Sequence, residues 1–468
     1  MTRSKTTCHS KIMTITRSIT AFYQRYFPSP FTIAIMLTLV TMLLAFLVGD
    51  NKGWSGLVSV FSYWEQGIWN NDLLVFAYQM MLILVLGHVL VLSSPMQNLI
   101  GKLTQYATTT QNAVVLVSVT TMLVAFFNWG LGLIYGAILA RQIGEHMQRA
   151  GRSFNYPLIG AAGYSGLMIW HGGISGSAPI KVAETGHLTS LMNGVGSPES
   201  IALLPQSINF DQTIFSSGNL LIFLAAVVFI PLTLNRLAKF APSTTVSFKG
   251  SNENYEESFH GSGERLDHSR ILSMSFGFLV LMVFFIQYSN SFSSLQITPN
   301  MLNFFLFGLA LILHRNFAAF GQAVGKAISG ASGILIQFPL YFGIMGIMKG
   351  AGLVVLLSNF FVGISTAVTL PIFTFFSAGL VNIFVPSGGG QWAIQGPIII
   401  ESAQQLGVPL PKMVLALAYG DQITNMLQPF WALPLLGITQ IKAKDLLPYT
   451  LVMMLVGVVI FGLGLLLI

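Results

Sequence analysis

The sequence predicts an all-α polytopic membrane protein built from two inverted repeats, each with a re-entrant hairpin and a broken transmembrane helix. Charged residues make up 8% of the 468-residue chain and apolar residues 53%, whereas an average soluble domain is about 25% charged. In addition, two similar stretches, one in each half, interrupt apolar sequence with Gly, Pro, Asn and Gln. Non-helical backbone at membrane depth survives only where it is buried in protein or lines a wet cavity. We therefore expect these two stretches to form the functional centre.

Six apolar runs approach the ~20 residues that a helix needs to cross a bilayer core. They are residues 31–48, 73–92, 213–230, 271–286, 301–313 and 447–468. With the broken segments included, we expect about nine full spans and two hairpins. The Lys and Arg residues lie in short segments on one side, as the positive-inside rule requires. The net charge of +7 therefore reflects membrane orientation, and we expect no nucleic acid partner.

The first half begins with a basic segment, residues 1–30, that we place in the cytoplasm. No small-residue cleavage site follows the first apolar run, so we expect an uncleaved span rather than a signal peptide. The first membrane repeat covers residues 31–240. Within it, a hairpin over residues 113–149 that turns at Asn128–Gly132 keeps the arginines after it in the cytoplasm. The following segment, residues 156–179, crosses the membrane and breaks at His171–Pro179.

The second half follows a hydrophilic segment, residues 241–268, that we interpret as a cytoplasmic linker without a packed core. The second membrane repeat covers residues 269–468. Its hairpin, residues 371–406, turns at Pro386–Gln391, and its broken helix covers residues 411–434. Hairpins that enter from opposite faces are what inverted repeats require. The apolar residues 352–370 are left unplaced, with the membrane interface as one location.

The tip of the second hairpin has the composition of an anion site. It consists of Ser387, Gly388, Gly389, Gly390, Gln391 and Trp392. Successive glycines expose backbone N–H groups, and a helix N-terminus adds roughly half a positive charge. The alternative is a tight turn that needs glycine conformations.

The second broken helix carries four polar residues on one predicted helical face. Asp421, Thr424, Asn425 and Gln428 are spaced at i, i+3, i+4 and i+7. An intramembrane acid is by default a site for a proton or a cation, so we assign Asp421, Asn425 and Gln428 to the coupling ion, H⁺ or Na⁺. The alternatives are a polar stripe that joins two helices and an ion pair between Asp421 and Lys412.

The first half contains counterparts of these residues. Tyr164 follows Asn128 by 36 residues, and Tyr419 follows Asn382 by 37. Paired broken segments at matching positions of two halves are the best sequence indication of a secondary transporter's substrate site. We therefore add to the substrate-binding set Asn128, Trp129, Gly130, Ser175, Gly176, Ser177 and Asn382. For His171 we leave open a direct role and a hydrogen bond to a freed helix carbonyl.

The ligand class follows from what surrounds the breaks. Tryptophans flank them at positions 129, 170, 392 and 431, and no lysine or arginine lies within them. Apolar walls with neutral hydrogen-bond donors suit a small monoanion with a short hydrocarbon tail, although tryptophan is also typical of bilayer interfaces. Cys8 is the only cysteine, which excludes an intrachain disulfide and a cysteine-based metal cluster. No catalytic motif appears at usable spacing, so we expect neither an enzyme nor a cofactor other than Na⁺ as a coupling ion.

Several longer strings allow a comparison with known families. They are Val385-Pro386-Ser387-Gly388-Gly389-Gly390-Gln391-Trp392, Gln395-Gly396-Pro397, Tyr419-Gly420-Asp421-Gln422 and Gln428-Pro429-Phe430-Trp431-Ala432-Leu433-Pro434, with Asn128-Trp129-Gly130, Gly172-Gly173 and Ser175-Gly176-Ser177 in the first half. From about residue 17 to the end, the chain resembles the bacterial short-chain fatty acid transporter family. The founding type of this family is the acetoacetate/butyrate uptake protein. The family has Glu where this chain has Asp421, so the acid is kept with a shorter reach.

The resemblance implies a multi-pass carrier of the bacterial inner membrane, within the broad ion-transporter superfamily. Its substrates would be acetoacetate, butyrate and similar monocarboxylates, and its coupling ion H⁺ or Na⁺. The alternatives are a passive carboxylate channel and a carrier for another small organic anion, with a membrane-embedded enzyme third. The bilayer and the carboxylate are the expected partners, and a homodimer is left open.

Overall fold

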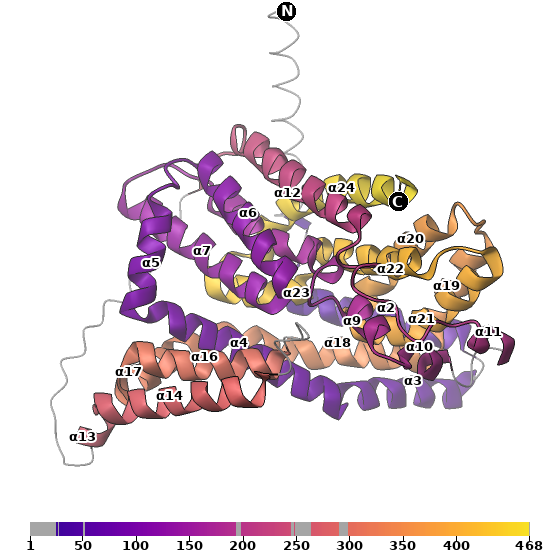
Figure 1. The fold of residues 1–468 in the computed structure, drawn as a ribbon, viewed down its shortest axis with the longest axis horizontal. Helices are drawn as coiled ribbons and strands as arrows, with labels where there is room; N and C mark the ends of the chain where they lie inside the picture. The colour runs from indigo at the N-terminus through magenta and orange to yellow at the C-terminus, as the bar shows by residue number, and fades with distance from the viewer. Residues whose placement is uncertain are drawn as a thin grey trace, which may run out of the picture.

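In the computed structural model of the chain, the described residues are 25–26, 28–49, 52–192, 198–244, 248, 264–289 and 298–467. Every regular element within this part of the chain is helical (Figure 1). The helices before the linker are α2 (Pro30–Val48), α3 (Gly53–Ile68), α4 (Asn71–Leu92), α5 (Ser94–Thr104), α6 (Thr110–Phe127), α7 (Trp129–Arg149), α8 (Tyr156–Tyr164), η1 (Ser165–Met168), η2 (Trp170–Gly172), α9 (Ser177–Ala183), α10 (His187–Met192), α11 (Pro198–Ala202) and α12 (Ser217–Ala238). Those after it are α13 (Glu264–Asp267), α14 (Arg270–Gln287), α16 (Pro299–His314), α17 (Phe317–Ala327), η3 (Ile328–Ala331), α18 (Ser332–Gly350), α19 (Leu353–Gly363), α20 (Leu370–Phe384), α21 (Gly388–Leu406), α22 (Leu410–Thr424), η4 (Asn425–Leu427), α23 (Pro429–Thr439) and α24 (Ala443–Leu467).

The predicted class, an all-α polytopic membrane protein, is confirmed. Among the described residues, six helices are long and apolar enough to cross a membrane, or up to seven if one bent pair counts as a single span. That pair covers Leu335–Gly350 and Leu353–Gly363, which meet at 67°. The outer helices expose large apolar side chains such as Leu39, Ile271 and Leu463. Apolar residues that face outward suit a hydrocarbon environment, in which they need no burial against protein.

Both predicted hairpins are present, but their turns are shorter than expected. The first joins α6 to α7 through Asn128 alone, and the second joins α20 to α21 through residues 385–387. The glycines that we expected in the turns instead lie in the first turns of α7 and α21. The reason is that Asn128 and Ser387 act as N-caps and start each helix at the next residue.

The open ends of the two hairpins lie at different ends of the molecule. Figure 1 shows that α6 and α7 open on the side of α5, whereas α20 and α21 open on the side of α19. Each open end is bonded to a neighbouring segment. After α7, Arg152 donates from its guanidinium to the carbonyl of Ala107, before α6, at 3.3 Å. Near the end of α21, Gln404 donates to the carbonyl of Ser200 in α11 at 2.9 Å. The two tips therefore point toward the middle of the protein.

Each hairpin is followed by a helix that is broken at its centre. Residues 165–176, the first break, separate α8 from α9 and contain η1 and η2. Residues 425–428, the second break, separate α22 from α23 and contain η4. The first break starts six residues earlier than the predicted His171, because the α-helix gives way to 3₁₀ geometry at Ser165.

Helices α3 and α18 form a tightly packed pair, and α18 also packs on α23, the helix that follows the second break. A Cβ on Gly67 would lie 2.3 Å from the carbonyl oxygen of Phe342, and one on Gly346 would lie 2.3 Å from that of Tyr63. Only glycine permits the two backbones to approach so closely. Membrane helices associate through such close packing at small residues, because the hydrophobic effect does not drive them together in lipid. Residues 353–363 of the stretch that we could not place from sequence form α19, which packs on α20 and α21.

The division of the chain into an N-terminal segment (1–30), a first membrane repeat (31–240), a linker (241–268) and a second membrane repeat (269–468) remains a prediction. Residues 1–24, including Cys8, lie outside the described residues, as does most of the linker.

Candidate functional site

The tip of the first hairpin is bonded to the first break. The backbone N–H of Trp129 donates to the hydroxyl of Ser175 at 2.9 Å. The N–H of Ile174 donates to the carbonyl of Phe126 at 2.8 Å. These bonds satisfy backbone groups that the unwound chain would otherwise bury without partners.

The tip of the second hairpin reaches the same break from its other side. A Cβ on Gly388 would lie 2.6 Å from Cε1 of His171, so only glycine fits there without a shift. A Cβ on Gly389 would lie 3.8 Å from that of Ser177, which is ordinary contact. The first break is therefore held between both tips.

A buried histidine–aspartate pair joins the two broken helices. Nδ1 of His171 lies 2.6 Å from Oδ2 of Asp421, and both side chains are almost fully buried. The backbone N–H of Ala178 donates to Nε2 of His171 at 3.1 Å. Because a backbone N–H can only donate, Nε2 is the acceptor, and the ring proton is on Nδ1, facing the carboxylate. The geometry therefore assigns an Nδ1–H that donates to the carboxyl group of Asp421.

Three further polar residues hold the freed backbone of the first break. Oε1 of Gln422 accepts from the N–H groups of His171 at 2.9 Å and Gly172 at 3.3 Å. The Asn219 amide donates to the carbonyl of Gly172 at 2.9 Å, and the Tyr419 hydroxyl donates to Oδ1 of Asn219 at 2.7 Å. None of these three residues was among the predicted site residues. Gln422 and Tyr419 lie beside the predicted Asp421, whereas nothing in the apolar run around Asn219 distinguishes it.

Asn382 contacts several polar groups of the second broken helix and the second break. Its amide nitrogen lies within hydrogen-bond distance of the Asp421 carbonyl at 2.6 Å, Oδ1 of Asn425 at 2.8 Å and Oγ1 of Thr424 at 3.0 Å. The amide of Gln428 in turn donates to the Asn382 carbonyl. The four residues predicted to share a helical face thus do meet, but not along one helix. The α-helix ends at Thr424, and the last two residues reach Asn382 from the second break.

Several buried polar atoms in this centre have no hydrogen-bond partner among the described residues. The acceptors are Oδ1 of Asp421, Oδ1 of Asn382, Oε1 of Gln391 and Oε1 of Gln428. The donors are Nε1 of Trp170, Nε2 of Gln422 and Nδ2 of Asn425. A buried donor or acceptor without a partner costs about 1–3 kcal/mol. Such a cluster is therefore typical of a site that a ligand or ion completes.

An aromatic wall adjoins the centre on the side of the first hairpin tip. The ring of Trp129 lies 5.8 Å from that of Trp170 and 5.1 Å from that of Trp431, centroid to centroid. The Phe76 ring lies 6.4 Å from Trp129 and 6.2 Å from Trp431. Three of the four tryptophans expected around the ligand therefore lie together.

The fourth tryptophan, Trp392, lies elsewhere. It is buried in a separate apolar cluster with residues of α9 and α10, and its indole donates to Nε2 of His187 at 3.0 Å. The indole N–H can only donate, so Nε2 accepts, and burial lowers the pKa of His187, which favours the neutral ring. The structure gives Trp392 a packing role against the loop after α9.

Two other predicted residues of the second tip bond within their own hairpin. The hydroxyl of Ser387 accepts from the N–H of Gly390 at 3.3 Å. The amide of Gln391 donates to the Ala378 carbonyl at 2.9 Å and to Oε1 of Gln395 at 2.7 Å. What the second tip presents to the first break is therefore the start of α21, where helix geometry leaves the first N–H groups without intrahelical acceptors.

The remaining predicted residues of the first half have structural contacts. Oδ1 of Asn128 accepts from the N–H of Leu131 at 2.9 Å and caps α7. Gly130 is buried in the first turn of α7, beside Oδ1 of Asn128. Gly176 lies where a Cβ would be 2.0 Å from the carbonyl oxygen of His171, so close approach of backbone requires glycine there.

A family model and two relatives agree on one family. A family model described as "Short chain fatty acid transporter" matches residues 11–468. The Escherichia coli (strain K12) protein named "Putative short-chain fatty acid transporter" is 36% identical over 458 residues, which cover 96% of this chain and 98% of that protein. The protein of the same name from Haemophilus influenzae (strain ATCC 51907 / DSM 11121 / KW20 / Rd) is 33% identical over 464 residues, 97% of this chain and 99% of that protein. A crystal structure of the Alcanivorax borkumensis YdaH transporter aligns with a TM-score of 0.45 and 15% identity, over 93% of this chain and 98% of that one.

Proposed function

The chain belongs to the short-chain fatty acid transporter family, and on that premise we propose that it is a secondary active carrier of small monocarboxylates. Acetoacetate and butyrate represent the proposed substrate class, and the bacterial inner membrane is the proposed location. The single observation that supports this proposal most is the meeting of both hairpin tips at the first break, beside a buried His–Asp pair.

The carboxylate is proposed to bind between the second tip and the two breaks. The start of α21 offers backbone N–H groups and the positive end of the helix dipole. The unpartnered donors of Trp170, Gln422 and Asn425 are available to the same anion. Neutral donors suit a monoanion, since they add no fixed cation that would have to be desolvated. The hydrocarbon tail is proposed to lie against Trp129 and Trp431.

The coupling ion is proposed to bind at Oδ1 of Asp421. Both nitrogens of His171 and Oδ2 of Asp421 already have partners, whereas Oδ1 has none among the described residues. A proton on Oδ1 would neutralise the carboxylate without breaking the bond to His171. The unpartnered oxygens of Asn382 and Gln428 also fit Na⁺, because hard cations prefer oxygen ligands.

Transport across the membrane is proposed to use hairpins that enter from opposite faces, with a cytoplasmic N-terminus. Ala150 and Gln405, near the open ends of the two hairpins, are exposed. Single cysteines at these positions, in a Cys8→Ser background, should react with an impermeant thiol reagent from opposite sides of the membrane. Labelling of both from the same side would contradict the inverted arrangement.

Uptake of labelled butyrate into proteoliposomes tests the function itself, with pH and Na⁺ gradients imposed separately. Accumulation above the outside concentration under one of the two gradients is expected, and the effective gradient identifies the ion. Downhill, non-saturating flux under both gradients would instead identify a passive channel, the alternative that the sequence excludes least. Saturable uptake that ignores butyrate but accepts another small anion would change the substrate class.

A further inference from the structure

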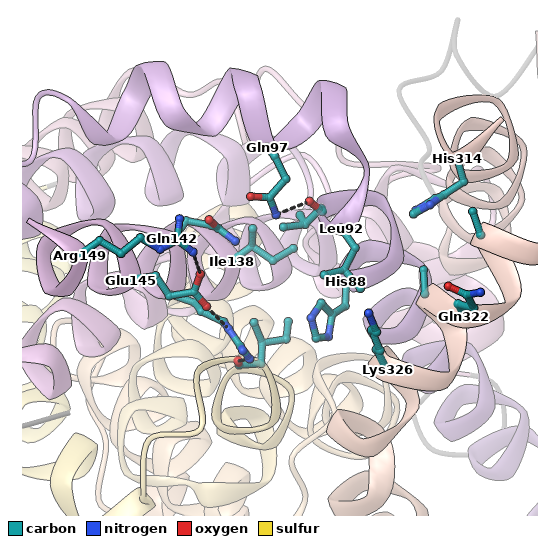
Figure 2. Close-up of a pocket in the computed structure, with 15 residues that line it drawn as sticks. His88, Leu92, Gln97, Ile138, Gln142, Glu145, Arg149, His314, Gln322 and Lys326 are labelled. Atoms are coloured by element: carbon teal, nitrogen blue, oxygen red, sulfur yellow. Dashed lines mark hydrogen bonds and ion pairs between the residues drawn. The ribbon is translucent and has the colours of Figure 1, made fainter. Parts of the chain in front are cut away.

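A polar cavity lies away from the His171–Asp421 centre. It has a volume of about 380 Å³ and lies between α4, α5 and α7 on one side and α16 and α17 on the other (Figure 2). Figure 2 shows Arg149 and Lys326 at opposite sides of the cavity, with His88 between them. The walls are formed by helices of both halves of the chain, and two of these, α5 and α17, are short and amphipathic. Helices of that kind are typical of a membrane–water interface.

The charges of this cavity are unbalanced. Arg141 and Arg149 contact the same carboxylate, Nε to Oε1 of Glu145 at 2.9 Å and Nη2 to Oε2 at 3.2 Å. Lys326 adds a third cation. The residues that line the cavity thus include three cationic side chains and one carboxylate, a formal sum of +2 over the lining alone, with the lining histidines, His88 and His314, counted as neutral. A cavity of this charge favours an anion.

Two apolar pockets extend from this basic cavity along α7. The first, of about 140 Å³, shares Val91 and Ile138 with it. The second, of about 220 Å³, shares Leu131 with the first pocket and reaches Asn128 at the hairpin tip. From Arg141 to Asn128 the helix rises ~20 Å. The three pockets therefore follow one another along α7, with the basic cavity at one end.

The lining decides what the two apolar pockets can hold. An anion placed in these pockets would lose its hydration without gaining hydrogen bonds, which is strongly unfavourable. An acyl chain has no such penalty. The combination of a basic cavity and adjoining apolar pockets therefore matches an amphiphile whose anionic head stays at the cavity.

We propose that this cavity binds the phosphate headgroup of an anionic phospholipid from the surrounding bilayer, with one acyl chain in the apolar pockets. Arg141, Arg149 and Lys326 would face the phosphate, as basic pockets between membrane helices do for anionic lipids. Because α7 carries the first hairpin tip at its other end, the bound lipid would hold that helix against α4 and α16. The proposal does not depend on the transported substrate.

The test is lipid binding to the purified full-length protein in detergent, measured by native mass spectrometry. Phosphatidylglycerol is titrated against phosphatidylcholine of the same acyl chains. We expect saturable, selective binding of phosphatidylglycerol. The variant Arg149→Gln/Lys326→Gln, which removes two exposed charges, should bind it about 30-fold more weakly. The control Lys442→Gln removes an exposed cation outside the cavity and should bind like the wild type.

Three results would overturn the proposal. Equal binding of the two lipids by the wild type would show that the cavity does not recognise the headgroup, and this readout needs no variant to fold. Displacement of phosphatidylglycerol by inorganic phosphate would assign the cavity to a free anion. Saturation by palmitate, lost in the same double variant, would assign it to a free fatty acid.

Discussion

Asn128 and Asn382 occupy comparable positions near the tips of the two hairpins, yet their side chains act in different ways. Asn128 bonds locally, since its Oδ1 accepts from Leu131 three residues ahead and starts α7. Asn382 bonds across the fold to Asp421, Thr424 and Asn425 of the second broken helix. Asparagine therefore caps a helix at the first tip, whereas near the second tip it forms hydrogen bonds to the broken helix.

The polar atoms without partners follow the same division. The acceptors at the centre all come from the second half, whereas the first half contributes the indole N–H of Trp170 and most of the aromatic wall. We infer that the second half supplies the ion site and the first half supplies shape for the ligand. His171 is the exception, because it belongs to the first half and bonds to Asp421.

The largest expected effect tests the second half. Asp421→Asn removes the negative charge but keeps an oxygen that can accept from His171. We therefore expect loss of butyrate accumulation against its gradient, with exchange between equal internal and external pools retained. Asp211→Asn, at an exposed position, is the matched control. Unchanged gradient-driven uptake by the Asp421 variant would remove this residue from coupling, and loss of both activities with poor expression would assign it a structural role.

The next largest effect compares adjacent glycines of the second tip. In Gly388→Ala the new methyl group would lie 2.6 Å from Cε1 of His171, which two hydrogen bonds hold in place. The resulting overpacking costs typically about 1–3 kcal/mol, and we expect uptake to fall at least tenfold as the His–Asp pair is displaced. Gly389→Ala should lose far less, because its nearest neighbour is 3.8 Å away. Equal uptake by the two variants, at equal expression, would show that the tip does not press on His171.

The sequence predicted the hairpins and broken helices because their signals are local. Apolar runs interrupted by Asn128 or by the Pro386–Gly390 stretch leave few other ways to satisfy the backbone in a membrane. The caps were harder to predict. Whether a serine such as Ser387 faces the ligand or its own helix depends on backbone angles that the composition does not fix, so the turns are shorter than expected.

The central pair could not be predicted because it is a contact between residues 250 positions apart. His171 and Asp421 each stood out as polar residues in apolar sequence, but nothing local indicates which of several partners each one finds. Trp392 shows the converse case, and its assignment to the ligand site stays a prediction. Its position beside the glycine-rich tip suggested the ligand wall, whereas α21 directs it to the other side, toward His187.

A stability comparison of the two asparagines comes third. Asn382→Ala removes an amide that bonds across helices and leaves buried acceptors without a donor. We expect this to lower the free energy of unfolding by about 2 kcal/mol. Asn128→Ala removes one N-cap, which should lower the free energy of unfolding by about 1 kcal/mol. We expect the lower thermal unfolding temperature in detergent for the Asn382 variant. The reverse order would show that the first tip, not the second, holds the fold together.

The smallest expected effects come from two serines, and they separate binding from capping. Ser175→Ala leaves the N–H of Trp129 without its acceptor, so it should cost about 1 kcal/mol of stability while the KM for butyrate stays unchanged.

Ser387→Ala removes an N-cap of similar value, but the hydroxyl hydrogen of Ser387 is also free to donate to a carboxylate at the second tip. If it does, the apparent KM should rise about tenfold, which corresponds to about 1.4 kcal/mol. Ser387→Thr keeps the hydroxyl and is the matched control, with a KM close to that of the wild type. A Ser387→Ala protein with reduced stability and an unchanged KM would make the two serines equivalent, and the carboxylate would then be held by backbone N–H groups and the unpartnered side-chain donors alone.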